Sequence, residues 1–445
     1  MGRRLSIKVR IISPAWPTGS FWGSMVFQFP ALALTTLAAA TPPDVEVVLT
    51  DENIEQIPER DDVDLVALSA MTPLAPRAYQ IAAQYRAQSV PVVLGGVHAT
   101  WCPDEAAQHV DCVVRGEGDW IWAQVIEDAQ RGCLRARYED RQWRPLDNIP
   151  APRWDLLTGK KYFFTNTLQT SRGCPHDCDF CSVTTFYGHK LRVKPLPRVL
   201  VELEACTGGK GFLFIVDDNI IGRPDYALDL FHQLRNYRLK WLSHATIDIA
   251  RDRQLLRACG ASGCYGLFIG FETLSQQRLD AIGKRTNVAN EYLDAARRIQ
   301  DAGIGIEAAF IVGHDDDDLG VFERTVEFIE RAKFDGVHLS VRTPYPGTRM
   351  YSELAAAGRI FDRDWQHYDL SQVVFKPAKM TADQLQEGFL WMWRQIYSYP
   401  SMLKRLLPPR RSLQVFGPMN VGLRQTCKKA GFFGPVLTTE LSDAF

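Results

Sequence analysis

Three cysteines lie on one short segment of the chain, TSRGCPHDCDFCSVTTFYG, at Cys174, Cys178 and Cys181. Thiolates are the usual ligands of iron–sulfur clusters, and three of them on one loop can bind three irons of a four-iron cube. The fourth iron then has no protein ligand and can bind a substrate or cosubstrate. The alternative is a zinc site completed by His176 or His189, because zinc also binds thiolate and imidazole. No second pair of ligands follows at zinc-finger spacing, so the pattern favours the cluster.

The segments around this loop alternate between short apolar runs and helix-length stretches. Strands are expected at 167–171, 211–216, 243–248, 266–270, 306–312 and 336–339. This series predicts a partial, TIM-like (β/α)6 barrel, in which functional groups lie at the carboxyl ends of the strands. The cysteine loop follows the first of these strands, so we expect it at that end of the barrel. After about residue 380 the sequence becomes helical and aromatic.

The first part of the chain shows the same alternation. Strands are expected at 6–13, 45–50, 65–69, 90–94 and 111–115, with helices at 29–40 and 75–88. Strands separated by crossover helices predict an α/β domain with a doubly wound, Rossmann-like parallel sheet. Ligands of such sheets lie outside the carboxyl ends of the strands, which here means the segments after Ser13, Ser69 and Leu94. Prolines between residues 145 and 152 mark the boundary with the barrel.

The composition is that of a globular protein with two or three domains, since 46% of its 445 residues are apolar and 23% are charged. Its 51 basic and 52 acidic residues nearly balance, so no nucleic-acid partner is expected. The opening MGRRLSIKVRIIS superficially resembles a signal peptide, but its charged, β-branched run is better interpreted as a first strand. No apolar run is long enough for a transmembrane segment, and a cytoplasmic protein is expected.

Seven further cysteines are scattered along the chain and do not resemble a disulfide framework. We expect them to be small buried hydrophobic residues: Cys102, Cys112, Cys133, Cys206, Cys259, Cys264 and Cys427.

The cysteine spacing, with the aromatic residue Phe180 directly before the third cysteine, resembles the radical S-adenosylmethionine (SAM) superfamily. The resemblance implies a 4Fe-4S cluster on the three cysteines, with SAM bound at the open iron and in contact with Phe180. It also implies that one electron from the cluster cleaves SAM to methionine and a 5′-deoxyadenosyl radical. This radical then takes a hydrogen atom from an unactivated carbon.

Four further residues match places where this superfamily binds SAM. The segment VDDNI, after the second barrel strand, contains Asp217, Asp218 and Asn219, whose acceptors would hold the ammonium group of SAM. The segment GLFIGFET puts Glu272 at the end of an apolar strand, where it would accept hydrogen bonds from hydroxyl or amino groups of SAM. The alternatives are an ordinary loop or helix cap for the first three residues and a solvated strand end for Glu272.

Two later barrel loops contain more candidates. AAFIVGHDDDD places Gly313 just after a strand, where glycine would let the adenine of SAM approach the backbone. The acidic run 315–318 is expected to be a solvated loop. RTPYPGT resembles a segment of these enzymes and would bring Arg342 and Tyr345 to the barrel mouth as candidate catalytic residues. Turn formation by its two prolines and its glycine is the alternative explanation.

The first domain resembles the cobalamin-binding domain of cobalamin-dependent radical SAM enzymes, in particular class B radical SAM methyltransferases. LVALSAMTP contributes Ser69 and Thr72, and VVLGGVHAT contributes Gly95, Gly96 and His98. The resemblance implies that these residues surround the nucleotide tail of the cofactor. VVRGEGD, at residues 113–119, is also typical of this subfamily. The resemblance covers nearly the first 380 residues.

One segment departs from familiar cobalamin domains. Those domains carry Asp-x-His-x-x-Gly after the first strand, and its histidine replaces the cofactor's own base on cobalt, whereas this chain has SPAWPTGS at residues 13–20. Either cobalt has no protein imidazole below it, as is usual in this subfamily, or the domain has lost cobalamin and kept the fold. His98 as a substitute ligand is a third possibility, and a structural role for His98 is its alternative.

Together these resemblances imply a methyltransferase that acts on an unactivated carbon with cobalamin and SAM. Cyclisation or rearrangement, with or without cobalamin, is the alternative activity, and a non-catalytic metal-binding scaffold is a more distant one. The expected domains are 1–145 for cobalamin, 156–380 for the radical SAM core and 381–445 for a helical C-terminal segment. The expected substrate is a small molecule such as a tetrapyrrole or an isoprenoid lipid, and the expected reductant is a flavodoxin or a ferredoxin.

Overall fold

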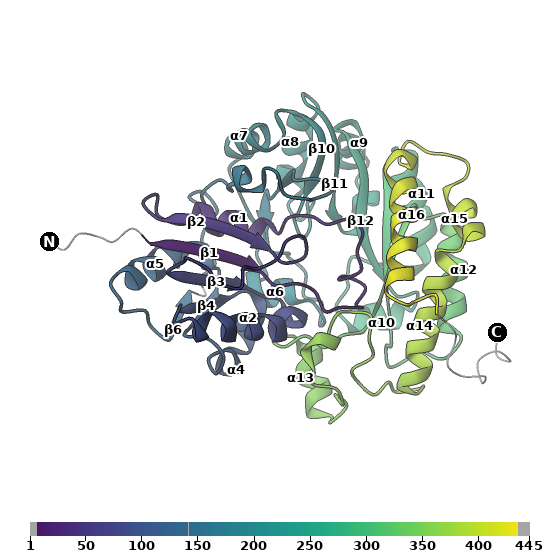
Figure 1. Ribbon diagram of the computed structural model, residues 1–445. Coiled ribbons are helices and arrows are strands. Elements are labelled where there is room, and N and C mark those ends of the chain that lie inside the picture. The colour runs from purple at the N-terminus through teal and green to yellow at the C-terminus, as the bar shows by residue number, and fades with distance from the viewer. Residues whose placement is uncertain (1–6, 141, 435–445) are drawn as a thin grey trace.

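The computed structural model describes residues 7–140 and 142–434. Its first sheet has six parallel strands in the order β2-β1-β3-β4-β5-β6 (Figure 1). The strands are β1 (Lys8–Ser13), β2 (Glu46–Asp51), β3 (Leu65–Ser69), β4 (Val92–Gly95), β5 (Cys112–Gly116) and β6 (Arg137–Asp140). Sequence reasoning missed β6, because this edge strand is only 4 residues long and every second side chain is exposed.

Helices cover both faces of the first sheet, as a doubly wound domain requires. Helices α1 (Leu32–Ala39) and α5 (Trp122–Gln130) pack on one face, and α2 (Ala75–Ala87) packs on the other. The short helices α3 (Val97–Trp101) and α4 (Pro103–Ala106) follow β4. The predicted Rossmann-like α/β fold is therefore confirmed.

The second sheet is also parallel, with six strands in the order β14-β13-β12-β11-β10-β7. They are β7 (Thr167–Leu168), β10 (Lys210–Ile215), β11 (Arg238–Ala245), β12 (Cys264–Glu272), β13 (Gly305–Val312) and β14 (Gly336–Val341). The sheet is open between β7 and β14, which makes it the expected partial barrel. The first predicted strand is divided, because its end forms β8 (Ser171–Arg172), which pairs with β9 (Arg192–Val193) in a separate hairpin. The strand predicted at 243–248 begins and ends earlier in the structure. It is β11, which ends at Ala245, and residues 247–251 form a 3-10 turn.

The helices between these strands are α7 (Leu196–Thr207), α8 (Pro224–Leu234), α9 (Arg253–Ala261), α10 (Gln276–Ala281), α11 (Tyr292–Asp301) and α12 (Val321–Ala332), and α13 (Arg349–Ala356) follows β14. The strand side chains that face the helices are buried. The side chains that alternate with them point inward and stay partly exposed on what we call the inner face: Phe214, His244, Phe268 and Glu307. The inner face of this sheet is therefore not filled by a packed core.

Three C-terminal helices lie at the β14 edge, on the side away from the first sheet (Figure 1). They are α14 (Ala382–Ile396), α15 (Tyr399–Leu406) and α16 (Leu413–Lys429). The ring of Phe416 on α16 lies where Cβ atoms on Gly266, Gly305 and Gly336 would clash with it, so it covers the amino-terminal ends of β12, β13 and β14. Within the described residues, every helix is too short or too polar to cross a membrane.

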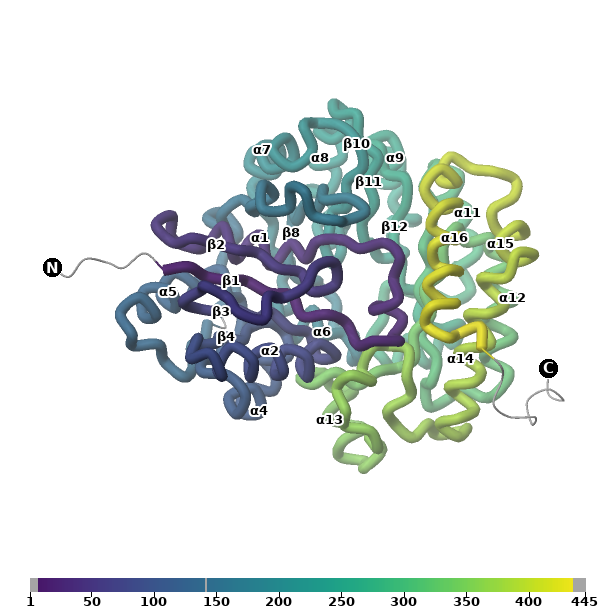
Figure 2. Tube along the Cα trace, viewed as in Figure 1, coloured from purple at the N-terminus to yellow at the C-terminus, as the bar shows by residue number. Residues whose placement is uncertain are grey.

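A long segment between β1 and α1, residues 14–31, connects the two parts of the molecule. Figure 2 shows it leaving the first sheet, passing over the second and reaching the C-terminal helices. Trp22 Nε1 donates to the carbonyl of Asp369 at 3.1 Å, and the ring of Phe21 lies 4.8 Å from that of Trp393. The aromatic C-terminal segment thus serves as core at Trp393, where this crossing segment packs.

Four of the seven scattered cysteines are buried as expected: Cys112, Cys259, Cys264 and Cys427. Cys102 and Cys206 are partly buried. The expectation was wrong for Cys133, which is exposed because it lies in the turn after α5.

Candidate active site

The three cysteines lie on the loop between β8 and α6 (Ser182–Tyr187), and all three are free and partly exposed. Burial raises the pKa of the Cys178 thiol to about 12 and that of Cys181 to about 11. Hydrogen bonds from the backbone N–H groups of Val183 and Thr184 lower the pKa of Cys181 and so oppose the effect of burial. The side chain of Asn219 lowers the pKa of Cys174 in the same way. Donors that point at sulfur stabilise thiolate ligands, so this donor set fits an iron–sulfur cluster.

Main-chain contacts from two later segments, the end of α10 and the start of α13, fix the cysteine loop. The N–H of Asp179 donates to the carbonyl of Ile282 at 3.0 Å, and the N–H of Met350 donates to the carbonyl of Asp179 at 3.1 Å. Gly283 has a φ of +76°, and a Cβ there would lie 2.6 Å from the carbonyl oxygen of Asp177. Sequence reasoning missed this glycine, because only the tertiary structure brings it against the loop.

Asp217 and Asp218 hold the strand that leads into the cysteine loop. The carboxylate of Asp217 is fully buried and accepts hydrogen bonds from Thr170 N and Ser171 Oγ, both at 2.7 Å. Asp218 accepts from Gly173 N at 3.2 Å, and burial raises its pKa to about 7. Asn219 joins the ends of β10 and β11 through Thr246. All three thus lie beside the cysteine loop, and their contact with SAM stays a prediction.

Glu272 lies at the end of β12 in a strained conformation. Its φ of +65° is uncommon for a residue with a side chain, and the register with β13 shifts at this point. Its carboxylate is buried and receives a hydrogen bond from Lys284 Nζ at 2.7 Å. Although burial lowers the pKa of Lys284, the charge of Glu272 raises it above its ordinary value. Such strain often accompanies functional sites, and the sequence did not indicate the lysine partner.

The loop after β13 differs from its predicted form. Gly313 has a φ of +97°, and its N–H donates to Asp317 Oδ2 at 2.8 Å. The expectation of a solvated acidic loop was wrong for Asp317, which is buried because it caps the N–H groups of Gly313 and His314. Burial raises the pKa of Asp317 to about 6.

The two candidate catalytic residues have different surroundings. Arg342 is buried between the cysteine loop and the β13 loop, with its Nη atoms 3.5 Å from Asp179 and 3.8 Å from Asp315. Tyr345 donates its hydroxyl to the carbonyl of Tyr368 at 2.8 Å and thus contacts the segment after the barrel. Only Arg342 of the pair has charged contacts with the cysteine loop.

A cavity of about 350 Å³ lies at the carboxyl ends of β3, β4 and β5, between the first sheet and the α6 region. Ser69, Gly95 and Gly96 line it from the first domain, and Arg172 and Tyr187 line it from the second. Small residues at strand ends leave room for a bulky cofactor tail, so the lining fits the nucleotide part of cobalamin. Thr72 is buried in the neighbouring 3-10 turn and does not line this cavity.

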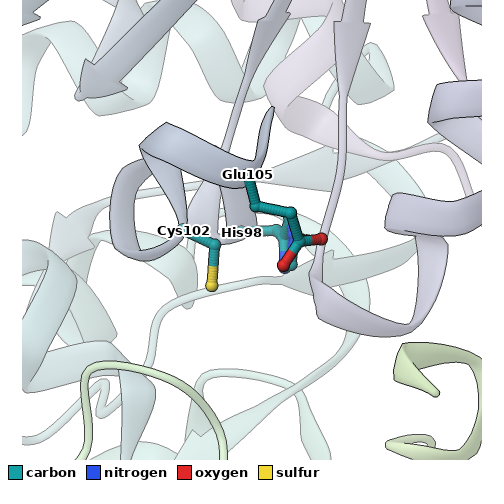
Figure 3. A group of neighbouring side chains, drawn as sticks. All are labelled: His98, Cys102 and Glu105. Carbon is teal, nitrogen blue, oxygen red and sulfur yellow. The ribbon is translucent and has the colours of Figure 1, made fainter. Parts of the chain in front are cut away.

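His98 is also outside the cavity lining. It is fully buried on α3, and its Nε2 lies 2.9 Å from the hydroxyl of Tyr79. Figure 3 shows it beside Cys102 and Glu105, and the three potential ligand atoms lie within 4.8 Å of one another. Trp365, from the segment after the barrel, donates to Glu105 at 2.9 Å. These contacts give His98 a structural place between the domains, and its proposed role below cobalt gains no support.

Two family models match the chain. The model described as "B12 binding domain" matches residues 24–126, and the model described as "Radical SAM superfamily" matches residues 168–329. The first range contains the cavity residues of the first sheet, and the second contains the cysteine loop. The chain therefore belongs to the radical SAM enzymes that carry a B12 binding domain.

Curated relatives narrow this class. The bacteriochlorophyllide d C-12(1)-methyltransferase of Chlorobaculum tepidum is 29% identical over 89% of this chain and 88% of its own length. The hopanoid C-2 methylase of Rhodopseudomonas palustris is 28% identical over 75% of this chain and 66% of its own length. The protein is thus a cobalamin-dependent radical SAM methyltransferase. The fold agrees with that of the cobalamin-dependent SAM radical enzyme OxsB, with a TM-score of 0.70 at 14% identity over 95% of this chain and 72% of OxsB.

Proposed function

We propose that this enzyme methylates an unactivated carbon at the periphery of a tetrapyrrole. The observation that carries the proposal is the inner face of the second sheet, where Phe214 and Phe268 stay partly exposed below the loops that would hold the cluster and SAM. Flat aromatic rings pack well against a planar macrocycle. The similarity to a bacteriochlorophyllide methyltransferase supports the same substrate class.

A hopanoid substrate, as in the second relative, fits the inner face less well. His244 and Glu307 lie in the same layer as Phe268, because each is its cross-strand partner. A saturated hydrocarbon ring system would bury His244 Nε2 and the Glu307 carboxyl group without a partner, which costs free energy. A tetrapyrrole has ring nitrogens and peripheral oxygen atoms, which can form polar contacts with both groups.

Residues at the strand ends of the second sheet would bind the cluster and SAM, and residues of the first sheet would bind cobalamin. The three cysteines would hold the cluster, and Asp218, Asn219, Glu272 and Gly313 would orient SAM beside it. The cavity at Gly95 would hold the nucleotide tail of cobalamin. When bound, the cluster supplies the electron that cleaves SAM, and cobalamin supplies the methyl group.

We further propose the division into a cobalamin domain at 1–145, a radical SAM core at 156–380 and a helical segment at 381–445. Continued turnover would need a one-electron donor such as flavodoxin or ferredoxin, because each SAM cleavage uses one electron.

Product mass tests the proposed function. The anaerobically reconstituted enzyme would be incubated with cobalamin, a reductant, SAM labelled in its methyl group and either a bacteriochlorophyllide or a hopanoid. We expect one labelled methyl group on the tetrapyrrole, and none with a Cys174→Ala variant. Labelled hopanoid together with unchanged tetrapyrrole would refute the proposed substrate class.

A further inference from the structure

His244 has an unusual setting on the inner face. It is partly exposed on β11, and its ring lies 5.4 Å from that of Phe214 and 5.3 Å from that of Phe268. Both neighbouring rings belong to the same inner face, one on β10 and one on β12. The imidazole is therefore held between two aromatic side chains at the place where a planar substrate would lie.

The hydrogen bond of His244 determines which ring nitrogen is available. Nδ1 lies 2.9 Å from the carbonyl oxygen of Asp217, and because a carbonyl only accepts, Nδ1 carries the proton. The lone pair is then on Nε2, which has no hydrogen-bond partner in the part of the chain that the structure describes. Nε2 is not sealed inside the protein and still reaches solvent. Burial lowers the pKa of His244 below its ordinary value, which keeps the ring neutral.

This arrangement is the one that proteins use for histidine ligands of metals. A metal-binding histidine usually donates its other N–H to a carbonyl or carboxylate, which fixes the tautomer and the ring orientation. The neutral imidazole then offers its lone pair to the metal. Here the backbone carbonyl of Asp217 accepts the hydrogen bond from His244 Nδ1. The position of this carbonyl is fixed, because the side chain of Asp217 is bound to Thr170 and Ser171.

We propose that His244 Nε2 is the axial ligand of the metal ion in a metallated tetrapyrrole substrate. The inference rests on the proposed function and adds to it a requirement for the metal. One bond forms between Nε2 and the metal, and a water molecule leaves the metal; no electron is transferred. The ligand would fix the macrocycle in depth and in rotation on the inner face, so that one peripheral carbon points toward the cluster loop.

His338 is the natural comparison, because it is the other histidine whose ring contacts Phe268, at 6.0 Å. It is 9% exposed and lies among the rings of Phe21, Trp22 and Trp393. These contacts come from the crossing segment and α14, and they cover most of the ring. A substitution at His338 therefore controls for a general disturbance of the inner face.

Equilibrium binding to the reconstituted full-length enzyme tests the inference without turnover. The probes are magnesium bacteriochlorophyllide and the same macrocycle without its metal, titrated into the wild type, His244→Phe and His338→Gln. We expect the wild type to bind the metallated form at least about tenfold more tightly and to shift its absorption from that of the water-ligated metal to that of an imidazole-ligated metal. His244→Phe should bind the two macrocycles with similar affinity and show no spectral shift, and His338→Gln should keep the preference for the metal.

A second variant separates ligation from structure. His244→Gly leaves space at the metal face, and added imidazole should restore the spectrum of the imidazole-ligated metal and the tighter binding. Iron content and thermal unfolding would establish that each variant is folded. Equal wild-type affinity for both macrocycles would overturn the inference and leave the proposed function intact. Persistence of the metal preference in His244→Phe would also overturn the inference. Failure of the wild type to bind either macrocycle would overturn the tetrapyrrole proposal together with the inference.

Discussion

The guanidinium of Arg172 donates to the carboxylate of Glu117 at 2.8 Å, across 55 residues of sequence. Arg172 stands two residues before the first cysteine of the cluster loop, and Glu117 follows β5 of the B12 binding domain. Glu117 also accepts from Arg192 at 2.5 Å, and Asp119 pairs with Arg172. Both Arg172 and Glu117 line the cavity at the strand ends, so one buried ionic network borders both candidate cofactor sites.

Arg172→Met should therefore destabilise the enzyme strongly. Removing one partner of a buried ion pair leaves an unmatched charge and typically costs about 3–5 kcal/mol. Because Arg192 still pairs with Glu117, we expect the lower end of this range, measured as a shift of the urea unfolding midpoint. Cobalamin retention should also fall, since the side chain lines the cavity.

Arg153→Ala is the matched control for this prediction. Its pair with Asp155 is exposed, with side-chain exposures of 46% and 60%, so its loss should cost less than about 1 kcal/mol. Equal midpoints for the wild type and Arg172→Met would contradict the proposed importance of the buried network.

Replacement of any cluster cysteine by alanine should remove iron and SAM cleavage. The three thiols are the proposed ligand set, and the loop that carries them is fixed by main-chain contacts that the substitution does not touch. Iron analysis after anaerobic reconstitution, together with detection of 5′-deoxyadenosine, measures the effect. The exposed Cys133→Ala and the buried Cys259→Ala should both keep full iron. Stoichiometric zinc without iron in the wild type would show that the cluster assignment is wrong.

Gly95→Phe should abolish cobalamin binding while the cluster remains. A Cβ on Gly95 would meet its nearest neighbour, Val114, at 3.8 Å, so a side chain fits the fold here and extends into the cavity. Gly96 is a less suitable position: with a φ of +97°, its Cβ would lie 2.8 Å from the carbonyl oxygen of Ala70, and any side chain would strain the backbone.

Corrin absorbance and iron content, measured on the same preparation, report the two sites separately. Gly95→Ala is the matched control and should retain corrin, because a methyl group occupies little of the cavity. Full corrin retention by a folded Gly95→Phe variant would show that the cofactor tail lies elsewhere.

Glu307 should make the stability of the enzyme fall as the pH rises. Burial on the inner face raises its pKa from 4.5 to about 7, so between these values the folded state binds more protons than the unfolded state. The free energy of unfolding therefore decreases from pH 5 to pH 8, by about 1–3 kcal/mol from this group. Glu307→Gln removes the titration, and its stability advantage over the wild type should grow with pH. If the urea midpoints of the two proteins differ by the same amount at pH 5 and at pH 8, this prediction is wrong.

The sequence alone indicated the elements whose signals are local. The three cysteines lie within a segment of 8 residues, so the cluster loop could be predicted. Apolar runs of strand length alternate with helix-length stretches, so the two α/β folds could be predicted as well. Prediction was weakest where tertiary contacts decide the structure. The edge strand β6 and the divided strand before Cys174 depend on pairing with distant segments, which local patterns do not reveal.

The sequence by itself therefore determined which chemistry this protein can perform, because ligand type and ligand spacing are properties of a short segment. Only the tertiary structure decided how the remaining candidates are used. It placed His98 in a polar contact with Tyr79 inside the first domain, enclosed the carboxylate of Asp217 behind the cluster loop and brought Lys284 to Glu272. It also left His244 partly exposed between two aromatic rings. The physical reason is that burial, partner and orientation arise when strands far apart in the sequence pack side by side, and these three properties determine what a polar side chain can bind.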